Sequence, residues 1–168
     1  ESETVVPGGD DDPSGEDVVT GTAPEVGKMY KGCYVLMKND DTENTFTLMS
    51  PKCLTLESVE DLETVVSKGI DELAVDGIDG WRLANESELD YMRINHSTIA
   101  ENLKNLKAGG ENVDEFITSA SSQQAKLYLG MVKGIIMSYN LTNVSELKGF
   151  SPGPGDILRA FATITYPE

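Results

Sequence analysis

The sequence has few of the residues that metal and nucleophilic chemistry require. Among 168 residues it holds one histidine, His96, and two cysteines, Cys33 and Cys53. A single histidine excludes a metal site with two or more histidine ligands, and no Cys-x-x-Cys spacing supports zinc. A general base needs an orienting partner and a nucleophile, and neither cysteine lies in a recognisable nucleophile context. We therefore expect no catalytic residues, no metal site and no enzyme activity.

Positive charge is scarce, and long apolar runs are absent. Thirteen Lys and Arg residues stand against 29 Asp and Glu residues, which gives a formal net charge of −16. So acidic a chain repels phosphate groups, and no basic stripe compensates, so we expect no nucleic-acid partner. No run of about 18 apolar residues is present, so the sequence predicts no membrane span.

Residues 1–26 differ in composition from the rest of the chain. They are rich in Ser, Thr, Gly and Pro, and they contain no Lys or Arg. Their eight acidic residues are Glu1, Glu3, Asp10, Asp11, Asp12, Glu16, Asp17 and Glu25. Such a segment cannot bury enough apolar surface to offset the entropy of ordering it. The sequence therefore predicts a flexible acidic spacer at 1–26 and one folded domain at 27–168.

Within that domain, β-rich runs are found near both ends. The first two, Tyr30–Lys38 and Thr45–Met49, are separated by turn-forming residues 39–44 and predict a hairpin. The other strands that we expect are Phe116–Ser119, Lys126–Val132, Gly134–Tyr139 and Asp156–Tyr166. Lys133-Gly134, between the second and third of these, predicts a hairpin turn. The last run is apolar on both faces, which predicts a strand in the centre of a sheet.

Two helices are expected between these strands. The first begins after Ser58 and ends at Gly69 or continues beyond it to Ala74. The second begins at an Asn85/Glu88 capping box and carries an apolar stripe along Leu89–Leu106. A break in this helix near Asn95 is an open alternative. We expect the stripe to pack on the domain's own sheet rather than on a partner.

The segment Gly80-Trp81-Arg82-Leu83 contains the only tryptophan and joins these two helices. It resembles the Gly-Trp-Arg-Leu signature of the Fibrobacter major paralogous domain family. Weaker echoes of that family follow in order at residues 116–121, 127–134 and 158–162. The resemblance implies an α+β, C-type-lectin-like fold related to formylglycine-generating enzymes. Two main helices would pack on short, mostly antiparallel strands.

The resemblance also implies a bacterial surface protein. On this basis we expect an exported domain at the outer-membrane surface or in the periplasm. The composition of the spacer predicts that a lipidated cysteine preceded Glu1 and attaches the protein to the membrane. The expected function is non-catalytic binding or adhesion, with a cell-surface glycan or protein as the partner. One alternative is a structural accessory subunit of a pilus-like assembly. Another is a degenerate formylglycine-generating enzyme, which is disfavoured because no cysteine follows Cys53.

Four residues are candidates for ligand binding: Asp76, Asp79, Trp81 and Arg82. Trp81 can stack on a sugar ring, but a core anchor is the favoured interpretation. Arg82 can bind a carboxylate bidentately, but an ion pair with Glu86 or Glu88 is favoured. Asp76 and Asp79 have the oxygen ligands that Ca²⁺ requires, although no cofactor is the favoured expectation.

The two cysteines leave two alternatives open. Cys33 and Cys53 can form a disulfide in an exported protein, or they can be two separate buried thiols.

Overall fold

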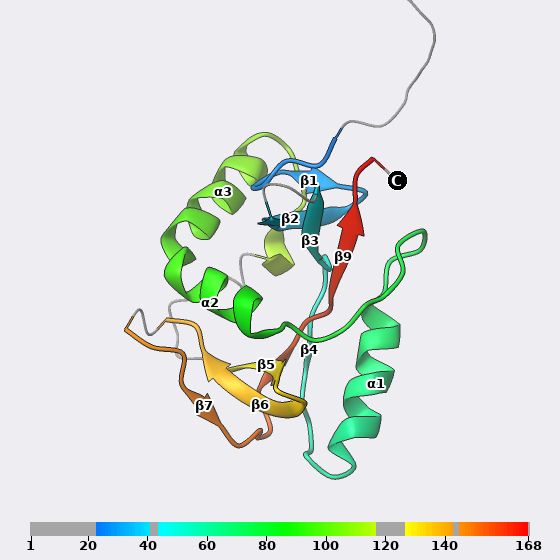
Figure 1. The fold of residues 1–168 in the computed structure, drawn as a ribbon, viewed down its shortest axis with the longest axis vertical. Coiled ribbons are helices and arrows are strands. Elements are labelled where there is room, and N and C mark those ends of the chain that lie inside the picture. The colour runs from blue at the N-terminus through cyan, green and yellow to red at the C-terminus, as the bar shows by residue number, and fades with distance from the viewer. Residues whose placement is uncertain (1–22, 41–43, 117–126, 143–144, 168) are drawn as a thin grey trace, which may run out of the picture.

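The computed structural model describes residues 23–40, 44–116, 127–142 and 145–167, which form a mixed α+β fold with two sheets (Figure 1). The first sheet has four strands in the order β1-β2-β3-β9, and all of its pairings are antiparallel. Its strands are β1 (Met29–Tyr30), β2 (Cys33–Asp40), β3 (Thr45–Met49) and β9 (Phe161–Thr165). The predicted hairpin of the first two runs is therefore confirmed.

The second sheet has five strands in the order β4-β8-β5-β6-β7. Only the pairing of β5 with β8 is parallel. Its strands are β4 (Leu54–Thr55), β5 (Leu127–Val132), β6 (Ile135–Asn140), β7 (Gly149–Phe150) and β8 (Ile157–Leu158). Lys133 and Gly134 join β5 to β6 with φ values of 54° and 78°. Two positive φ values suit the right-handed twist of a two-residue hairpin, so the predicted turn is confirmed.

The helices whose bounds lie within the described residues are α1 (Leu62–Leu73), α2 (Glu86–Ile94) and α3 (His96–Ala108), and residues 114–116 are helical as well. The Asn85 side chain accepts a hydrogen bond from the Glu88 amide at 2.9 Å, and Glu88 Oε1 accepts one from the Asn85 amide at 3.0 Å. The predicted capping box is therefore present. The apolar stripe is divided at Asn95, which resolves the open alternative in favour of a break.

The end predicted for the first helix at Gly69 is wrong, and the continuation beyond it is correct. Gly69 lies in the interior of α1 and is buried. A Cβ atom at this position would overlap Leu158 Cδ2. The glycine therefore allows α1 to approach β8 closely, rather than ending the helix. This approach brings α1 onto the apolar cluster of Leu56, Val66, Ile70, Leu73, Leu83, Leu129, Leu158 and Ala160.

Two predicted strands differ from the structure. The run Asp156–Tyr166 is divided into β8 and β9, which belong to different sheets. β8 is central, as expected, but β9 lies at the edge of its sheet. The apolar pattern of β9 does not require a central position, because Ala162 and Ile164 pack with Ile78 of the loop before Trp81. Phe116 is helical rather than extended, and residues 117–119 lie outside the described residues.

The predicted spacer falls mostly outside the described residues. Among its last four residues, Pro24 is already buried, and the Glu25 carbonyl accepts a hydrogen bond from the Lys28 amide at 3.0 Å. Within the described chain, no helix has the length and apolar character needed to cross a lipid bilayer.

Candidate functional site

The segment from Trp81 to Ala84 connects the two sheets. Arg82 pairs with Phe161 at the outer edge of β9, with N–O distances of 2.8 and 2.7 Å in the two directions. Two residues later, Ala84 bridges to Gly130 of β5, and its carbonyl accepts a hydrogen bond from the Met131 amide at 2.8 Å. A Cβ atom at Gly130 would meet Leu89 Cδ1 at 2.6 Å, so this glycine allows the segment and α2 to lie against β5.

Arg82 is held by the buried carboxylate of Glu88. Its Nη1 and Nη2 atoms donate to Glu88 Oε1 and Oε2 at 2.7 and 2.8 Å. Glu88 is 1% exposed and also accepts a hydrogen bond from the Thr47 hydroxyl on β3 at 3.0 Å. Arg82 Nη2 donates to Thr163 Oγ1 on β9 at 2.6 Å. The predicted ion pair with a neighbouring acid is therefore correct, and Glu88 is the partner.

Trp81 anchors the same segment. Its indole nitrogen donates to the Ile78 carbonyl at 2.9 Å, and its ring packs against two of the apolar clusters. Since the ring is only partly buried, one part of it also faces an open groove. The core-anchor interpretation fits this contact, and the exposed part leaves room for a ligand.

The other two candidates lie apart from that groove. Asp76 and Asp79 are exposed and do not line it. Their loop turns through Gly77 and Gly80, whose φ values are 88° and 80°. Among the described residues, no three His, Cys, Asp or Glu side chains gather as a metal-binding group would.

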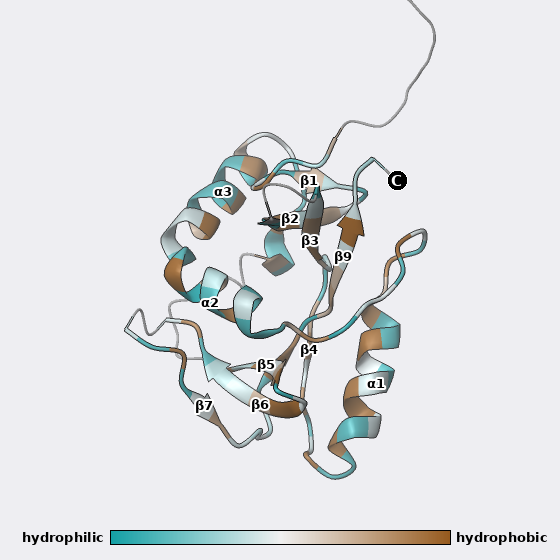
Figure 2. Cartoon of the chain, in the orientation of Figure 1, coloured by the Kyte–Doolittle hydropathy of each residue, from teal (hydrophilic) through white to brown (hydrophobic). Residues whose placement is uncertain are grey.

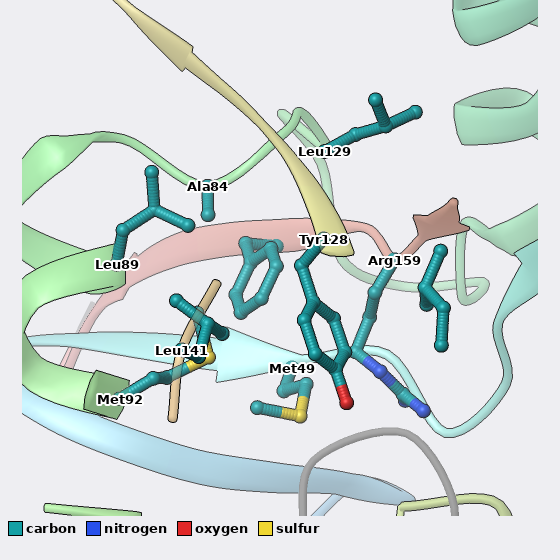
Figure 3. A pocket seen from close by; sticks show the side chains of 10 residues that line it. Met49, Ala84, Leu89, Met92, Tyr128, Leu129, Leu141 and Arg159 are labelled. Carbon is teal, nitrogen blue, oxygen red and sulfur yellow. The ribbon is translucent and has the colours of Figure 1, made fainter. Parts of the chain in front are cut away.

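A small apolar cavity lies in the interior. It has a volume of about 10 Å³ and lies between α2 and β5, bordered by Met49, Leu89, Tyr128 and Phe161 (Figure 3). This volume suits at most one water molecule. The cavity is therefore too small for a larger ligand.

Buried charge lies beside this cavity. Arg159 is 3% exposed, and its guanidinium donates to the carbonyls of Ser50 and Glu115 and stacks 5.1 Å from the Phe116 ring centroid. Burial lowers the pKa of Arg159 to about 10, which still leaves it charged at neutral pH. Burial also raises the pKa of Tyr128 to about 12. Their contacts join strands and loops, which indicates a structural role.

An open surface groove has a volume of about 1220 Å³, and we call it the α1 groove. Its lining comes from α1 with the preceding Asp61, which we call the α1 wall, from the segment that contains Trp81 and Leu83, and from the tip of the β5–β6 hairpin, which we call the hairpin wall. Its lining residues are Asp61, Leu62, Glu63, Thr64, Val66, Ser67, Ile70, Asp71, Trp81, Arg82, Leu83, Asn85, Met131, Gly134, Ile135 and Ile136. Two of the four predicted site residues, Trp81 and Arg82, therefore share this surface.

The hairpin wall of the α1 groove exposes large apolar side chains. Met131 is 42% and Ile135 is 59% exposed, although both belong to regular strands. Figure 2 colours the start of β6 as hydrophobic. Sequence reasoning missed these two residues, because an apolar residue in a strand is expected to point into the core.

The cysteines are two free thiols in this structure. Cys33 is buried on β2, and burial raises its pKa to about 11. Cys53 is half-buried and interacts with Arg159. The structure therefore matches the alternative of two separate thiols, not the disulfide. His96 lies at the start of α3, away from both the α1 groove and the enclosed cavity.

Residues 149–153 have the spacing Gly-x-Ser-x-Gly, which sequence reasoning missed. In a hydrolase, the serine of this motif lies on a sharp turn from a strand into a helix. Here Ser151 follows the two-residue edge strand β7, and the chain continues through a turn into β8 without a helix. The Gly153 amide donates to Asp156 Oδ2 at 2.7 Å, so this loop closes on itself. The segment lacks the geometry of a nucleophile elbow.

Comparison of the chain with protein-family models, with curated proteins and with solved structures finds no match in any of the three. The resemblance of Gly80-Trp81-Arg82-Leu83 to the Fibrobacter major paralogous domain family therefore remains a prediction from the residues.

Proposed function

We propose that this chain is a non-catalytic binding domain of an exported bacterial cell-envelope protein, and that the α1 groove holds its ligand. The supporting observation is the exposure of Met131 and Ile135 beside Trp81. Exposed apolar groups that gather in one concave surface are typical of interaction sites. A C-type-lectin-like fold, with Trp81-Arg82-Leu83 as its signature, is part of the same proposal.

A binding role suits the lining of the α1 groove better than a catalytic role. Among the described lining residues none is His, Cys or Lys. The guanidinium of Arg82 is already engaged by Glu88. The bases that line the groove are the exposed carboxylates Asp61, Glu63 and Asp71, and a solvated carboxylate is a weak base for activating the hydroxyl groups of Thr64 and Ser67.

The single tryptophan provides a direct test. Because Trp81 lines the groove, a ligand that enters it should change the fluorescence of the unmodified protein. The intact chain would be titrated with a panel of cell-wall oligosaccharides and with synthetic peptides. At least one class should give a saturable change that Ile135→Asp abolishes.

Ile94 provides the matched control. It is 64% exposed and lies at the end of α2, outside the groove. Ile94→Asp should leave the titration unchanged. The proposal fails if no compound gives a saturable change, or if Ile94→Asp and Ile135→Asp weaken binding equally.

A further inference from the structure

We infer that the ligand of the α1 groove is a basic amphipathic segment of a partner protein. This inference rests on the proposed function, because it names the class of ligand for the same surface. It follows from the different chemistry of the two walls, one acidic and one apolar.

The acidic wall belongs to α1. Asp61, Glu63 and Asp71 all line the groove, and all three are exposed. Lys68 is the only lysine of α1, and it does not line the groove. A surface of one charge sign attracts ligands of the opposite sign and speeds their association.

Among the described lining residues, Arg82 is the only cation, and it is already paired. Arg82 forms a bidentate pair with Glu88, so its charge is compensated within the fold. Lys133 at the hairpin tip adjoins the groove residue Gly134 but does not itself line the groove. The groove therefore presents a net negative charge, which disfavours phosphates, acidic glycans and acidic peptides.

The hairpin wall is apolar, and it favours a ligand that also carries apolar side chains. Met131 and Ile135 line the groove together with Ile136 and Leu83. Aliphatic side chains of a peptide can bury these groups, and the gain is about 25 cal/mol per Å² of apolar surface removed from water. A neutral glycan would cover them less well, because its hydroxyl groups need hydrogen-bond partners when they leave water.

The inference rests on side-chain contacts with the ligand segment. β5 is paired with β6, β8 and Ala84, but β7 pairs with β6 only at Ser138 and Tyr139. The first residues of β6 therefore also keep a free backbone edge, which an extended segment can pair with. The 12 residues of α1 extend about 18 Å, which is the length of about five extended residues or three helical turns.

The test uses a ten-residue synthetic peptide of alternating Leu and Lys, titrated into the intact chain and followed by Trp81 fluorescence. The matched probes are the same peptide with Glu in place of Lys, and a neutral glucose hexasaccharide. We expect saturable binding of the Leu-Lys peptide alone. The triple variant Asp61→Asn, Glu63→Gln and Asp71→Asn should weaken this binding about tenfold.

A second triple variant controls for net charge. Glu25, Glu101 and Glu111 are exposed and lie outside the groove. Their replacement with Gln also removes three negative charges but should change the affinity less than about twofold, since distant exposed charges are screened by salt. Circular dichroism of each variant would confirm that it is folded.

The outcomes separate this inference from the proposed function. Binding of the hexasaccharide or the Leu-Glu peptide instead of the Leu-Lys peptide would overturn the inference and leave the α1 groove as a binding site. An equal loss of affinity for the Leu-Lys peptide in the two triple variants would show that the peptide is attracted to the whole acidic chain. That result would also overturn the inference. If no probe or wider panel member alters Trp81 fluorescence, both proposals fail.

Discussion

Arg82 and Glu88 form a two-pronged ion pair, with N–O distances of 2.7 and 2.8 Å, between the segment that joins the sheets and the first turn of α2. The same carboxylate closes the capping box with Asn85 and accepts a hydrogen bond from Thr47 on β3. One buried side chain thus links the helix start, one sheet and the connecting segment.

Loss of the Glu88 carboxylate should therefore be costly. Removing one partner of a fully buried pair typically costs about 3–5 kcal/mol, and the Arg82 side chain is 35% exposed, so water solvates part of the remaining charge and the loss lies at the low end of that range. We expect Glu88→Ala to lower the free energy of unfolding by about 3 kcal/mol, measured by urea denaturation. Glu86→Ala, in the same helical turn but exposed, is the control and should cost less than about 1 kcal/mol. Equal effects of the two variants would contradict this account.

Gly69 should be required for the packing of α1. Alanine is normally better than glycine in a helix by about 1 kcal/mol. Here its Cβ atom would overlap Leu158, and overpacking of a core costs about 1–3 kcal/mol. We expect Gly69→Ala to destabilise the protein in urea denaturation. In combination with Leu158→Ala, the loss should be smaller than the sum of the two single losses; a gain in stability from Gly69→Ala alone would refute the close contact.

The sequence predicted correctly those features that depend only on residues close together in the chain. The Asn85/Glu88 capping box, the Lys133-Gly134 turn and the ion pair of Arg82 all depend on neighbours within a few residues, and all were predicted. Gly69 was misjudged because glycine both ends helices and permits close helix packing. Only the tertiary contact with Leu158 distinguishes the two roles.

The α1 groove could be predicted only in part. Trp81 and Arg82 were named as site residues because they are distinctive in the sequence. Met131 and Ile135 were not, since an apolar residue in a strand does not reveal from the sequence that it is exposed beside a groove. In the sequence, the acidic residues of α1 cannot be distinguished from those of an ordinary solvated helix face. Only the structure shows that they line a groove together with the hairpin.

The two cysteines should differ in reactivity. Thiolate is the reactive form of cysteine, and burial raises the pKa of Cys33 to about 11. Cys53 is half-buried and lies near a guanidinium. With a thiol reagent at pH 8 and no reductant, we expect one fast reaction in the folded protein, assigned to Cys53 by its loss in Cys53→Ala. Two thiols should react in denaturant, and an absence of free thiols there would instead show a disulfide.

Stability should fall at alkaline pH. Burial raises the pKa of Cys33 to about 11 and that of Tyr128 to about 12, whereas the unfolded groups ionise near about 8.5 and 10. Between these values the unfolded chain has lost protons that the folded chain retains. The contribution of these two protonated groups to the free energy of unfolding is therefore fully present below about pH 8.5. It is lost as the pH rises toward 11 for Cys33 and toward 12 for Tyr128.

Urea denaturation at several pH values between 8 and 10.5 would measure this loss. We expect Cys33→Ala to flatten the decline by about 2 kcal/mol over this range, because the variant lacks the ionising thiol. Cys53→Ala is the control. The same slope in Cys33→Ala and the parent protein would show that the Cys33 thiol contributes nothing to the decline.

The central claim is that ligands enter the groove between α1 and the β5–β6 hairpin. Methyl NMR of the intact chain, recorded during titration with the Leu-Lys peptide, locates the contact directly. The account predicts shifts at Met131, Ile135 and Ile70, with Ile94 and Ile99 unchanged. Shifts at Ile94 and Ile99 with none at Met131 and Ile135 would contradict it.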